Sequence, residues 1–274
     1  MNRVTRVFST VRAQRRKALI AFVMAGDPSL TDTARLMHRL DAAGVDILEL
    51  GIPFSDPLAD GPTIQAAAER ALKSATTLRR VLRLVQRFRR QSARPVVLLS
   101  YVNPLLRFGG AVSTTMSVGA ACHALFRAAR QAGVDGVVIP DLPIEESRSV
   151  RQMGDRYGVA VMPLAAPTSP PARLRAIAQS ARGFIYYVSV TGTTGARRQL
   201  PDTVITGVQR LKRLTRVPVC VGFGISTPQQ ARRIARVADG VIIGSALVQR
   251  WARHHSLRAV EQFIHTLRHA IQSR

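Results

Sequence analysis

The chain has 274 residues, of which 46% are hydrophobic and 20% are charged, and its mean hydropathy is +0.06. These values are typical of a folded globular protein and exclude disordered, collagen-like and disulfide-rich classes. Arginines or turn residues interrupt every apolar run before it reaches the roughly 18 residues of a membrane span, so we expect no spanning segment. The two cysteines, Cys122 and Cys220, form no CxxC metal pair, which indicates a reducing compartment and a cytoplasmic location.

Short apolar runs bounded by glycine, proline and aspartate alternate with helix-like segments along the chain. The predicted strands lie at 19–25, 46–52, 95–102, 136–140, 160–165, 184–190, 218–223 and 240–243. The predicted helices lie at 29–43, 78–90, 121–132, 144–157, 172–180, 202–214, 228–237 and 257–271. Continuously apolar strands are typical of a parallel sheet buried on both faces, so these units predict an α/β fold, a single (β/α)8 TIM barrel. A doubly wound open sheet is the alternative, although no GxGxxG motif follows the first strand.

Residues 1–17 precede the first strand and contain no acidic residue. Val4, Val7, Phe8 and Val11 form one helical stripe, which predicts an extra basic helix covering the bottom of a barrel that spans 18–274. Arginine with serine and threonine is also the composition of an organellar leader, which is the alternative interpretation. Because the same arginine bias continues to the end of the chain, we favour the covering helix.

Two segments interrupt the alternation of strands and helices. Residues 107–120 are rich in glycine, serine and threonine and long for a strand-to-helix connection, which indicates an insertion. Residues 192–201 follow the sixth predicted strand and are rich in glycine and threonine, as a hinged active-site lid would be. An ordinary connecting loop is the alternative for the second segment.

The net charge of +24 raises the hypothesis of nucleic-acid binding. The chain has three lysines and 37 arginines, spread over nearly every predicted helix rather than gathered in one block. In the segment 78–90 the apolar side chains form one stripe and the arginines mostly occupy the rest, which favours solvated helix faces. No aromatic residues interleave with arginine to stack bases, so we do not expect a nucleic-acid partner.

One glutamate lies in the second predicted strand, and two aspartates lie in the loop that follows it. Glu49 lies inside the run Ile47–Ile52, and a carboxylate in such an apolar run must be paired or have a raised pKa. Asp56 and Asp60 follow in the loop above it. In a barrel the reacting groups lie at the C-terminal strand ends, so this region offers carboxylates for acid and base chemistry. A glutamate held by a neighbouring arginine is the structural alternative.

Glycines and a serine at the ends of the last two strands predict a phosphate site. Gly224 follows the seventh strand, and Gly244 and Ser245 follow the eighth. These two loops commonly form the phosphate site of a barrel, because glycine lets an oxyanion approach backbone N–H groups. Ser245 would also open a short helix whose N-terminus favours negative charge.

The positions of the lysines and histidines argue against two other chemistries. Lys17 precedes the first strand, and Lys73 and Lys212 lie in helical segments, so no lysine is placed for imine catalysis. All six histidines fall in helices or connections, which leaves no metal-ligand set at the barrel mouth. The remaining chemistry is proton transfer, without a metal or a cofactor, on a phosphorylated small molecule.

The segment GIPFSDPLADGPTIQ at 51–65, preceded by Glu49, resembles the signature of the tryptophan synthase alpha subunit. Further segments that resemble this family are FVMAGDP at 22–28, AGVDGVVIPDLPIEES at 132–147, YYVSVTGTTGAR at 186–197, GFGIST at 222–227 and GSALV at 244–248. The resemblance covers residues 18–250 in order. It implies retro-aldol cleavage of indole-3-glycerol phosphate to indole and glyceraldehyde 3-phosphate.

By this resemblance, Glu49 is the acid–base group at the indole C3 and the substrate hydroxyl, and Asp60 stabilises the indolenine cation. The resemblance also implies further binding residues. Those expected to bind the substrate are Phe22, Ile64, Leu99, Tyr101, Tyr186 and Thr194. Those expected to bind the phosphate are Gly195, Phe223, Gly224, Gly244 and Ser245.

The resemblance also implies a partner. The family subunit carries no cofactor, joins a pyridoxal-phosphate beta subunit in an alpha2-beta2 heterotetramer, and passes indole to it. The loop at 53–60 and the loop after the third strand would face that partner, although the insertion at 107–120 departs from the family pattern. The alternatives are a non-catalytic phosphate-binding barrel that activates a beta subunit, a basic barrel recruited to RNA, and a different phosphosugar isomerase.

Overall fold

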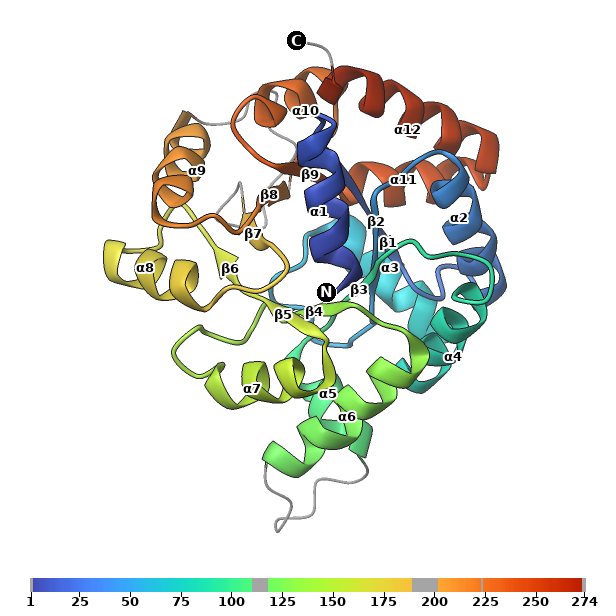
Figure 1. The fold of residues 1–274 in the computed structure, drawn as a ribbon. Helices are drawn as coiled ribbons and strands as arrows, with labels where there is room; N and C mark the ends of the chain where they lie inside the picture. The colour runs from blue at the N-terminus through green and yellow to red at the C-terminus, as the bar shows by residue number, and fades with distance from the viewer. Residues whose placement is uncertain (1, 110–117, 189–201, 223, 273–274) are drawn as a thin grey trace.

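The computed structural model describes residues 2–109, 118–188, 202–222 and 224–272. Its strands are β1 (Ala18–Met24), β2 (Ile47–Gly51), β3 (Val96–Leu99), β4 (Gly136–Val138), β5 (Ala160–Met162), β6 (Leu164–Ala165), β7 (Ile185–Val188), β8 (Val219–Gly222) and β9 (Gly240–Ile243). The strands stand at the centre of a ring of helices, with α1 (Arg3–Ala13) crossing in front of them in Figure 1. None of the described helices is long and apolar enough to cross a membrane.

The ring of helices alternates with the strands along the chain. After α1 come α2 (Leu30–Ala42), α3 (Pro62–Lys73), α4 (Leu78–Phe88), α5 (Val102–Leu106), the short 3-10 helix η1 (Arg107–Gly109) and α6 (Val118–Ala132). The second half contains α7 (Arg148–Tyr157), α8 (Pro171–Ser180), α9 (Asp202–Leu214), α10 (Pro228–Ala235), α11 (Ser245–His254) and α12 (Leu257–Gln272). The prediction of a (β/α)8 barrel with an extra N-terminal helix is confirmed.

All described strand pairs are parallel, and the sheet order is β5-β4-β3-β2-β1-β9-β8-β7-β6. The run predicted as one strand at 160–165 is divided at Pro163, which has no N–H to donate to a ladder. Its first part, β5, pairs with β4, whereas its second part, β6, pairs with β7. The single bent strand therefore joins the two ends of the sheet, and the Pro163 carbonyl accepts the Tyr186 N–H at 3.0 Å.

The helix α1 packs against the N-terminal strand ends. Val4, Phe8 and Val11 are buried on its inner side, as their spacing predicted, and the Phe8 ring lies 6.0 Å from the ring of Phe184. Asn2 caps the helix by accepting the Val4 N–H at 2.8 Å. The division of the chain into units 1–17 and 18–274 stays a prediction.

Three aspartates tie helices to strands at this same N-terminal end of the barrel. Asp46, Asp135 and Asp239 each immediately precede a strand and are mostly buried. Their carboxylates accept the backbone N–H groups of Leu19, Val96 and Val219, respectively, at 2.9, 3.0 and 2.9 Å. They also form ion pairs, Asp46 with Arg16 and Arg268, Asp135 with Arg3 and Arg89, and Asp239 with Lys212. Each carboxylate thus satisfies a strand-end N–H and anchors basic side chains from helices or the α1–β1 turn.

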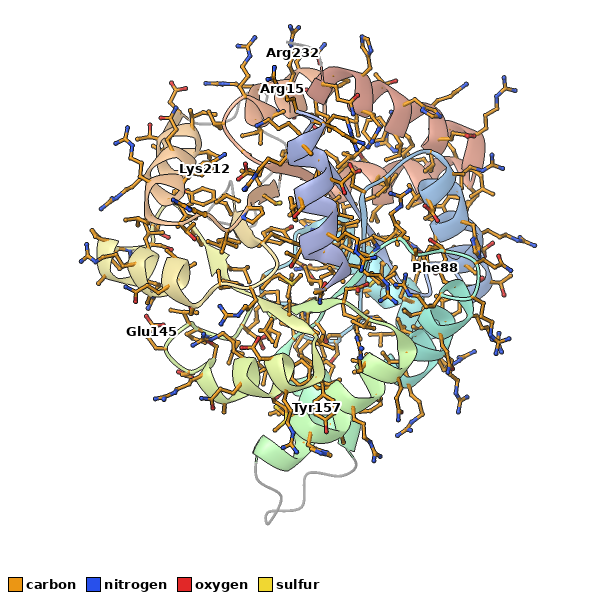
Figure 2. All side chains as sticks on the ribbon, in the orientation of Figure 1. Arg15, Phe88, Glu145, Tyr157, Lys212 and Arg232 are labelled. Carbon is orange, nitrogen blue, oxygen red and sulfur yellow. The ribbon has the colours of Figure 1, made fainter. Side chains whose placement is uncertain are left out.

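The arginines lie mainly on the outer faces of the helices, as their pattern predicted. In α4 the buried residues are Leu78, Val81, Leu82, Leu84, Val85 and Phe88. Figure 2 shows nitrogen-tipped side chains projecting outward around the whole ring. Arginine on these faces keeps its charge in water while its methylene groups cover apolar surface.

The structure differs from the predicted elements in several places. Helices α3 and α5 were not among the predicted helices, α11 was expected only as a short helix opened by Ser245, and α7 begins at Arg148 rather than at 144. Of the predicted insertion at 107–120, η1 and the start of α6 are helical, while 110–117 lie outside the described residues. The proposed lid at 192–201 also lies outside them.

Candidate active site

Glu49 occupies an interior position of the barrel wall. In the strand register it stands beside Phe22 of β1 and Val97 of β3, and its exposed fraction is 0%. Neither carboxyl oxygen has a hydrogen-bond partner among the described residues. A buried polar group without a partner destabilises the fold, so its position in the apolar interior indicates a functional role.

The surroundings of Glu49 favour its protonated form. Burial, and secondarily the nearby charge of Asp60, raise the pKa of Glu49 to about 8. Both causes oppose ionisation, since burial removes water and a second carboxylate adds like charge. At neutral pH Glu49 is therefore mainly a carboxylic acid that can donate a proton.

Asp60 lies in the loop that leads from β2 to α3. Its side chain is 6% exposed, and burial raises its pKa to about 6, while a hydrogen bond from the Tyr101 hydroxyl acts in the opposite direction. The same hydroxyl accepts the Ala59 N–H at 3.0 Å, so Tyr101 holds both the loop and the carboxylate. Asp60 is thus mainly ionised at neutral pH. Asp56, which the sequence also offered as a carboxylate for this region, is exposed and bonds to Ser55.

A narrow cavity of about 40 Å³ lies at the C-terminal strand ends; Asp60 and Phe22, the β1 neighbour of Glu49, line it, whereas Glu49 itself is not among its lining residues. Eight residues predicted for the site line it, namely Phe22, Asp60, Ile64, Leu99, Tyr186, Gly224, Gly244 and Ser245. Ile225 and Ile242 complete its lining and were not predicted. Ile242 could have been found from the sequence, because side chains alternate along a strand and the predicted Gly244 lies two residues further on.

The strand ends β8 and β9 supply backbone groups to this cavity. Helix α11 begins at Ser245, as predicted, after the N-cap residue Gly244. Its first N–H groups and the helix dipole favour an anion at this position. Gly224 has a φ of +73°, a left-handed conformation that glycine adopts at little cost. This end of the cavity is suited to a phosphate group.

Two glycines let aromatic side chains stand inside the barrel. A Cβ atom on Gly222 would lie 2.4 Å from the Tyr186 hydroxyl oxygen, and one on Gly51 would lie 2.5 Å from Cζ of Phe22. Real Cβ atoms do not approach other atoms this closely, so both rings depend on the absence of a side chain at these positions. Neither glycine was predicted to have a packing role.

Three predicted site residues cannot be placed. Thr194, Gly195 and Phe223 lie outside the described residues, so their predicted roles stay predictions. Tyr101 is placed, but its hydroxyl is directed to Asp60 and Ala59.

The loop after β1 is fixed by an ion pair that the sequence did not reveal. Arg70 of α3 donates to both carboxylate oxygens of Asp27, at 2.7 and 2.8 Å. The Trp251 indole N–H of α11 donates to the Asp27 carbonyl at 2.9 Å. Together, the ion pair and the indole hydrogen bond connect α3, which carries Ile64, to α11, which carries Ser245, through Asp27.

The described residues supply acid–base groups and backbone donors to the cavity. Lys73 is the last residue of α3 and Lys212 lies on α9, both away from the cavity lining. Within the described ranges no group of three or more histidine, cysteine, aspartate or glutamate side chains could hold a metal ion. The arrangement can protonate a carbon or a hydroxyl at Glu49, stabilise a cation at Asp60 and bind an anion at Ser245.

A second, larger cavity of about 480 Å³ is lined in part by residues of β5 and β6. Its lining is mostly apolar and includes Leu58 and Ala59 of the β2–α3 loop, Pro163 between β5 and β6, and Val188. Leu58 is 85% exposed, which is unusual for a large apolar side chain. Asp60 lines only the smaller cavity, which is therefore the candidate site of proton transfer.

Comparisons with known proteins show the family of this chain. The family model described as tryptophan synthase alpha chain matches residues 8–272. The tryptophan synthase alpha chain of Geobacter sulfurreducens is 45% identical over 99% of both chains. That of Carboxydothermus hydrogenoformans is 47% identical over 91% of this chain and 89% of its own. The crystal structure of the alpha chain from Legionella pneumophila superposes with a TM-score of 0.87 at 35% identity, covering 99% of this chain and 97% of that one. The chain belongs to the tryptophan synthase alpha chain family.

Proposed function

We propose that this chain is a lyase that cleaves indole-3-glycerol phosphate to indole and glyceraldehyde 3-phosphate by a retro-aldol reaction. The observation that carries the proposal is the pair of buried carboxyl groups, Glu49 and Asp60, whose pKa values are raised to about 8 and about 6. Two carboxyl groups with separated pKa values can act as an acid and an anion in one site.

Glu49 performs both proton transfers in this proposal. As a neutral acid it protonates C3 of the indole, which makes that carbon tetrahedral and leaves the positive charge at the ring nitrogen. The Glu49 carboxylate then accepts the proton of the hydroxyl on the adjacent side-chain carbon. The carbon–carbon bond breaks, the bonding electrons return to the ring, and the hydroxyl carbon becomes the aldehyde. No atoms are added, and Glu49 ends in its starting protonation state.

Asp60 stabilises the cationic intermediate. Its carboxylate, mainly ionised at neutral pH, faces the ring nitrogen, on which the positive charge develops after C3 is protonated. In a cavity shielded from water this attraction is stronger than in solution. Tyr101 supports the role by donating a hydrogen bond to the carboxylate, which favours its ionised form.

The rest of the lining accounts for substrate binding. Phe22, Ile64, Leu99 and Tyr186 surround the indole, and the N-terminus of α11 binds the phosphate. Because a cavity of about 40 Å³ is smaller than an indole ring, lining side chains must move when the substrate binds. By the family resemblance, Thr194 approaches Asp60 and Gly195 and Phe223 complete the phosphate site.

The proposed partner is a tryptophan synthase beta subunit, in an alpha2-beta2 heterotetramer that converts the indole to L-tryptophan. This chain would need no cofactor of its own, and pyridoxal phosphate would belong to the beta subunit. The exposed Leu58 beside the 480 Å³ apolar cavity supports docking at the loop 53–60, since an exposed apolar surface of this kind suits a protein interface. The bacterial relatives support a cytoplasmic location.

The test is indole release from indole-3-glycerol phosphate by the purified chain, with and without a beta subunit. Glu49→Gln keeps the size of the side chain, but the amide cannot transfer a proton to the substrate or accept one from it. The rate of indole release should therefore fall about 10²–10⁴-fold. The control is Glu145→Gln, since Glu145 is exposed and its ion pair with Arg173 lies at the surface. Activity should also persist in chelator and in borohydride.

Two results would contradict the proposal. A Glu49→Gln variant as active as the wild type would remove Glu49 from the mechanism. A folded wild-type chain that releases no indole under any condition, but activates a beta subunit, would identify a non-catalytic regulatory subunit.

A further inference from the structure

A small hollow lies at the N-terminal end of the barrel, opposite the candidate active site. Its volume is about 190 Å³, and it sits where α1 ends and β1, β8 and β9 begin. Its lining consists of Phe8, Val11, Arg12, Arg15, Arg16, Lys17, Pro218 and Asp239. Four of these eight side chains are cations and one is an anion.

The acidic side chains nearby are already engaged. Asp239 pairs with Lys212 at 2.7 Å and accepts the Val219 N–H at 2.9 Å. Asp46 is shared between Arg16 and Arg268. Among the described residues, neither Arg15 nor Lys17 forms an ion pair with a carboxylate. The hollow therefore carries an excess of positive charge.

Arg15 holds an uncommon backbone conformation at this position. Its φ is +54°, in the left-handed region where a residue other than glycine or asparagine is rare. The N–H of Arg16 donates to the Val11 carbonyl at 2.8 Å and that of Arg15 to the Arg12 carbonyl at 3.0 Å, as in a helix end that glycine usually completes. The backbone strain places a guanidinium at the edge of the hollow, where glycine would have left none. Figure 2 labels Arg15 at this end of α1.

The hydrogen-bonding capacity of two further cations in the hollow, Arg16 and Lys17, is only partly used. Nη1 of Arg16 is buried and has no hydrogen bond among the described residues, although it lies 3.6 Å from an Asp46 carboxylate oxygen. The Lys17 ammonium donates to the Ala238 carbonyl at 2.8 Å. Burial, and secondarily the charge of Lys212, lower the pKa of Lys17, although Asp239 acts in the opposite direction. An anion in the hollow would offset this loss of hydration and this repulsion.

We propose that this hollow binds a small dianion of the phosphate class, either inorganic phosphate or a phosphate monoester, between Arg12, Arg15, Arg16 and Lys17. The guanidinium group of arginine and the ammonium group of lysine are the side-chain groups that bind phosphate oxygens most strongly. The volume of about 190 Å³ admits a phosphate group with a short substituent.

The test uses the full chain with ¹³C-labelled lysine, titrated with sodium phosphate while sodium chloride holds the ionic strength constant. With three lysines in the chain, each NMR signal is assignable from Lys→Arg variants. The Lys17 signal should shift and saturate at millimolar phosphate, whereas the Lys73 signal should not. A parallel titration with glycerol phosphate tells whether the ester or the inorganic ion binds more tightly.

Arg15→Gly provides the decisive variant. Glycine suits a φ of +54°, so the variant should fold at least as well as the wild type. Loss of the Arg15 guanidinium should weaken phosphate binding about tenfold or more. Arg90→Gln is the control. Arg90 is exposed and does not line the hollow, so this substitution removes the same charge outside the proposed site.

The outcomes are distinct. Saturable movement of Lys17 that Arg15→Gly weakens and Arg90→Gln leaves unchanged supports the site. An unmoved Lys17 signal overturns it, and so does equal movement in all three proteins, which would indicate general charge screening. Phosphate bound only beside Ser245 would leave Lys17 unmoved, so failure here is separable from failure of the proposed catalytic function.

Discussion

The buried carboxylates at the two ends of the barrel differ in their hydrogen-bond and ion-pair partners. At the N-terminal end, Asp46, Asp135 and Asp239 each accept a strand N–H and pair with arginine or lysine. At the C-terminal end, Glu49 has no hydrogen-bond partner among the described residues, and the charge that raises its pKa further is that of another carboxylate, Asp60. The comparison separates acids that hold the fold together from acids kept reactive at the expense of stability.

The largest effect is expected from removing the negative charge of Asp60 at the C-terminal end of the barrel. Asp60→Asn keeps the shape of the side chain but cannot balance the ring cation, so indole release should fall about 10²–10⁴-fold. The measurement is a steady-state assay with the folded state verified by circular dichroism. Asp56→Asn serves as the control, since Asp56 is exposed in the same loop. Equal rates in Asp60→Asn and the wild type would place Asp60 outside the chemistry.

The second largest effect is expected from removing the negative charge of Asp135 at the N-terminal end of the barrel. Asp135 is 3% exposed and bonds to Arg3, Arg89 and the Val96 N–H, at 3.0, 3.3 and 3.0 Å. Asp135→Asn leaves the largely buried Arg89 uncompensated and should lower the free energy of unfolding by about 3 kcal/mol, without changing kcat. Urea unfolding measures it. Asp155→Asn, at a half-exposed pair, should cost less than about 1 kcal/mol.

The third effect tests whether Glu49 destabilises the fold. Its pKa of about 8 lies above the unfolded value of 4.5, so between these pH values the unfolded chain releases a proton that the folded chain keeps. Wild-type stability should therefore decline as pH rises through this window and level off above it. Glu49→Gln lacks this loss and should be more stable by on the order of 2 kcal/mol in mildly alkaline solution. Parallel pH dependences of unfolding in the two proteins would contradict a raised pKa.

The smallest effect concerns the hydroxyl that supports Asp60. Tyr101→Phe removes the hydrogen bond that lowers the pKa of Asp60, so that pKa should rise and the acid limb of the pH–rate profile should move to higher pH. The rate at neutral pH should fall about tenfold. Tyr157→Phe is the matched control, because Tyr157 bonds to His123 between α6 and α7. A lower rate with an unmoved profile would mean that Tyr101 only holds the loop.

The sequence predicted the barrel because its strands are continuous apolar runs with clear boundaries. It missed α3, whose buried stripe is Ile64, Ala67, Ala68 and Ala71, because alanines give a weak hydrophobic pattern. The division of strand 160–165 depends on Pro163, whose missing N–H matters only once the neighbouring strands are known.

The candidate site was predicted unevenly for a similar reason. Glu49 stood out because a charge inside an apolar run is visible locally. The contact of Tyr101 with Asp60 and the bidentate pair of Arg70 with Asp27 join segments far apart in the chain, so no local pattern signals them. The paired aspartates at the N-terminal strand ends were missed as well, although each directly precedes a strand.

The bend at Pro163 also bears on how the barrel opens. Because β5 pairs only with β4, and β6 only with β7, each part of this bent strand pairs with a neighbouring strand on one side only. Native-state hydrogen exchange should therefore find the most rapidly exchanging strand amides here, while β1, which pairs along most of its length with both β2 and β9, exchanges last. The two parts of this bent strand form a seam that lines the apolar cavity of about 480 Å³ and lies away from the contact between β1 and β9.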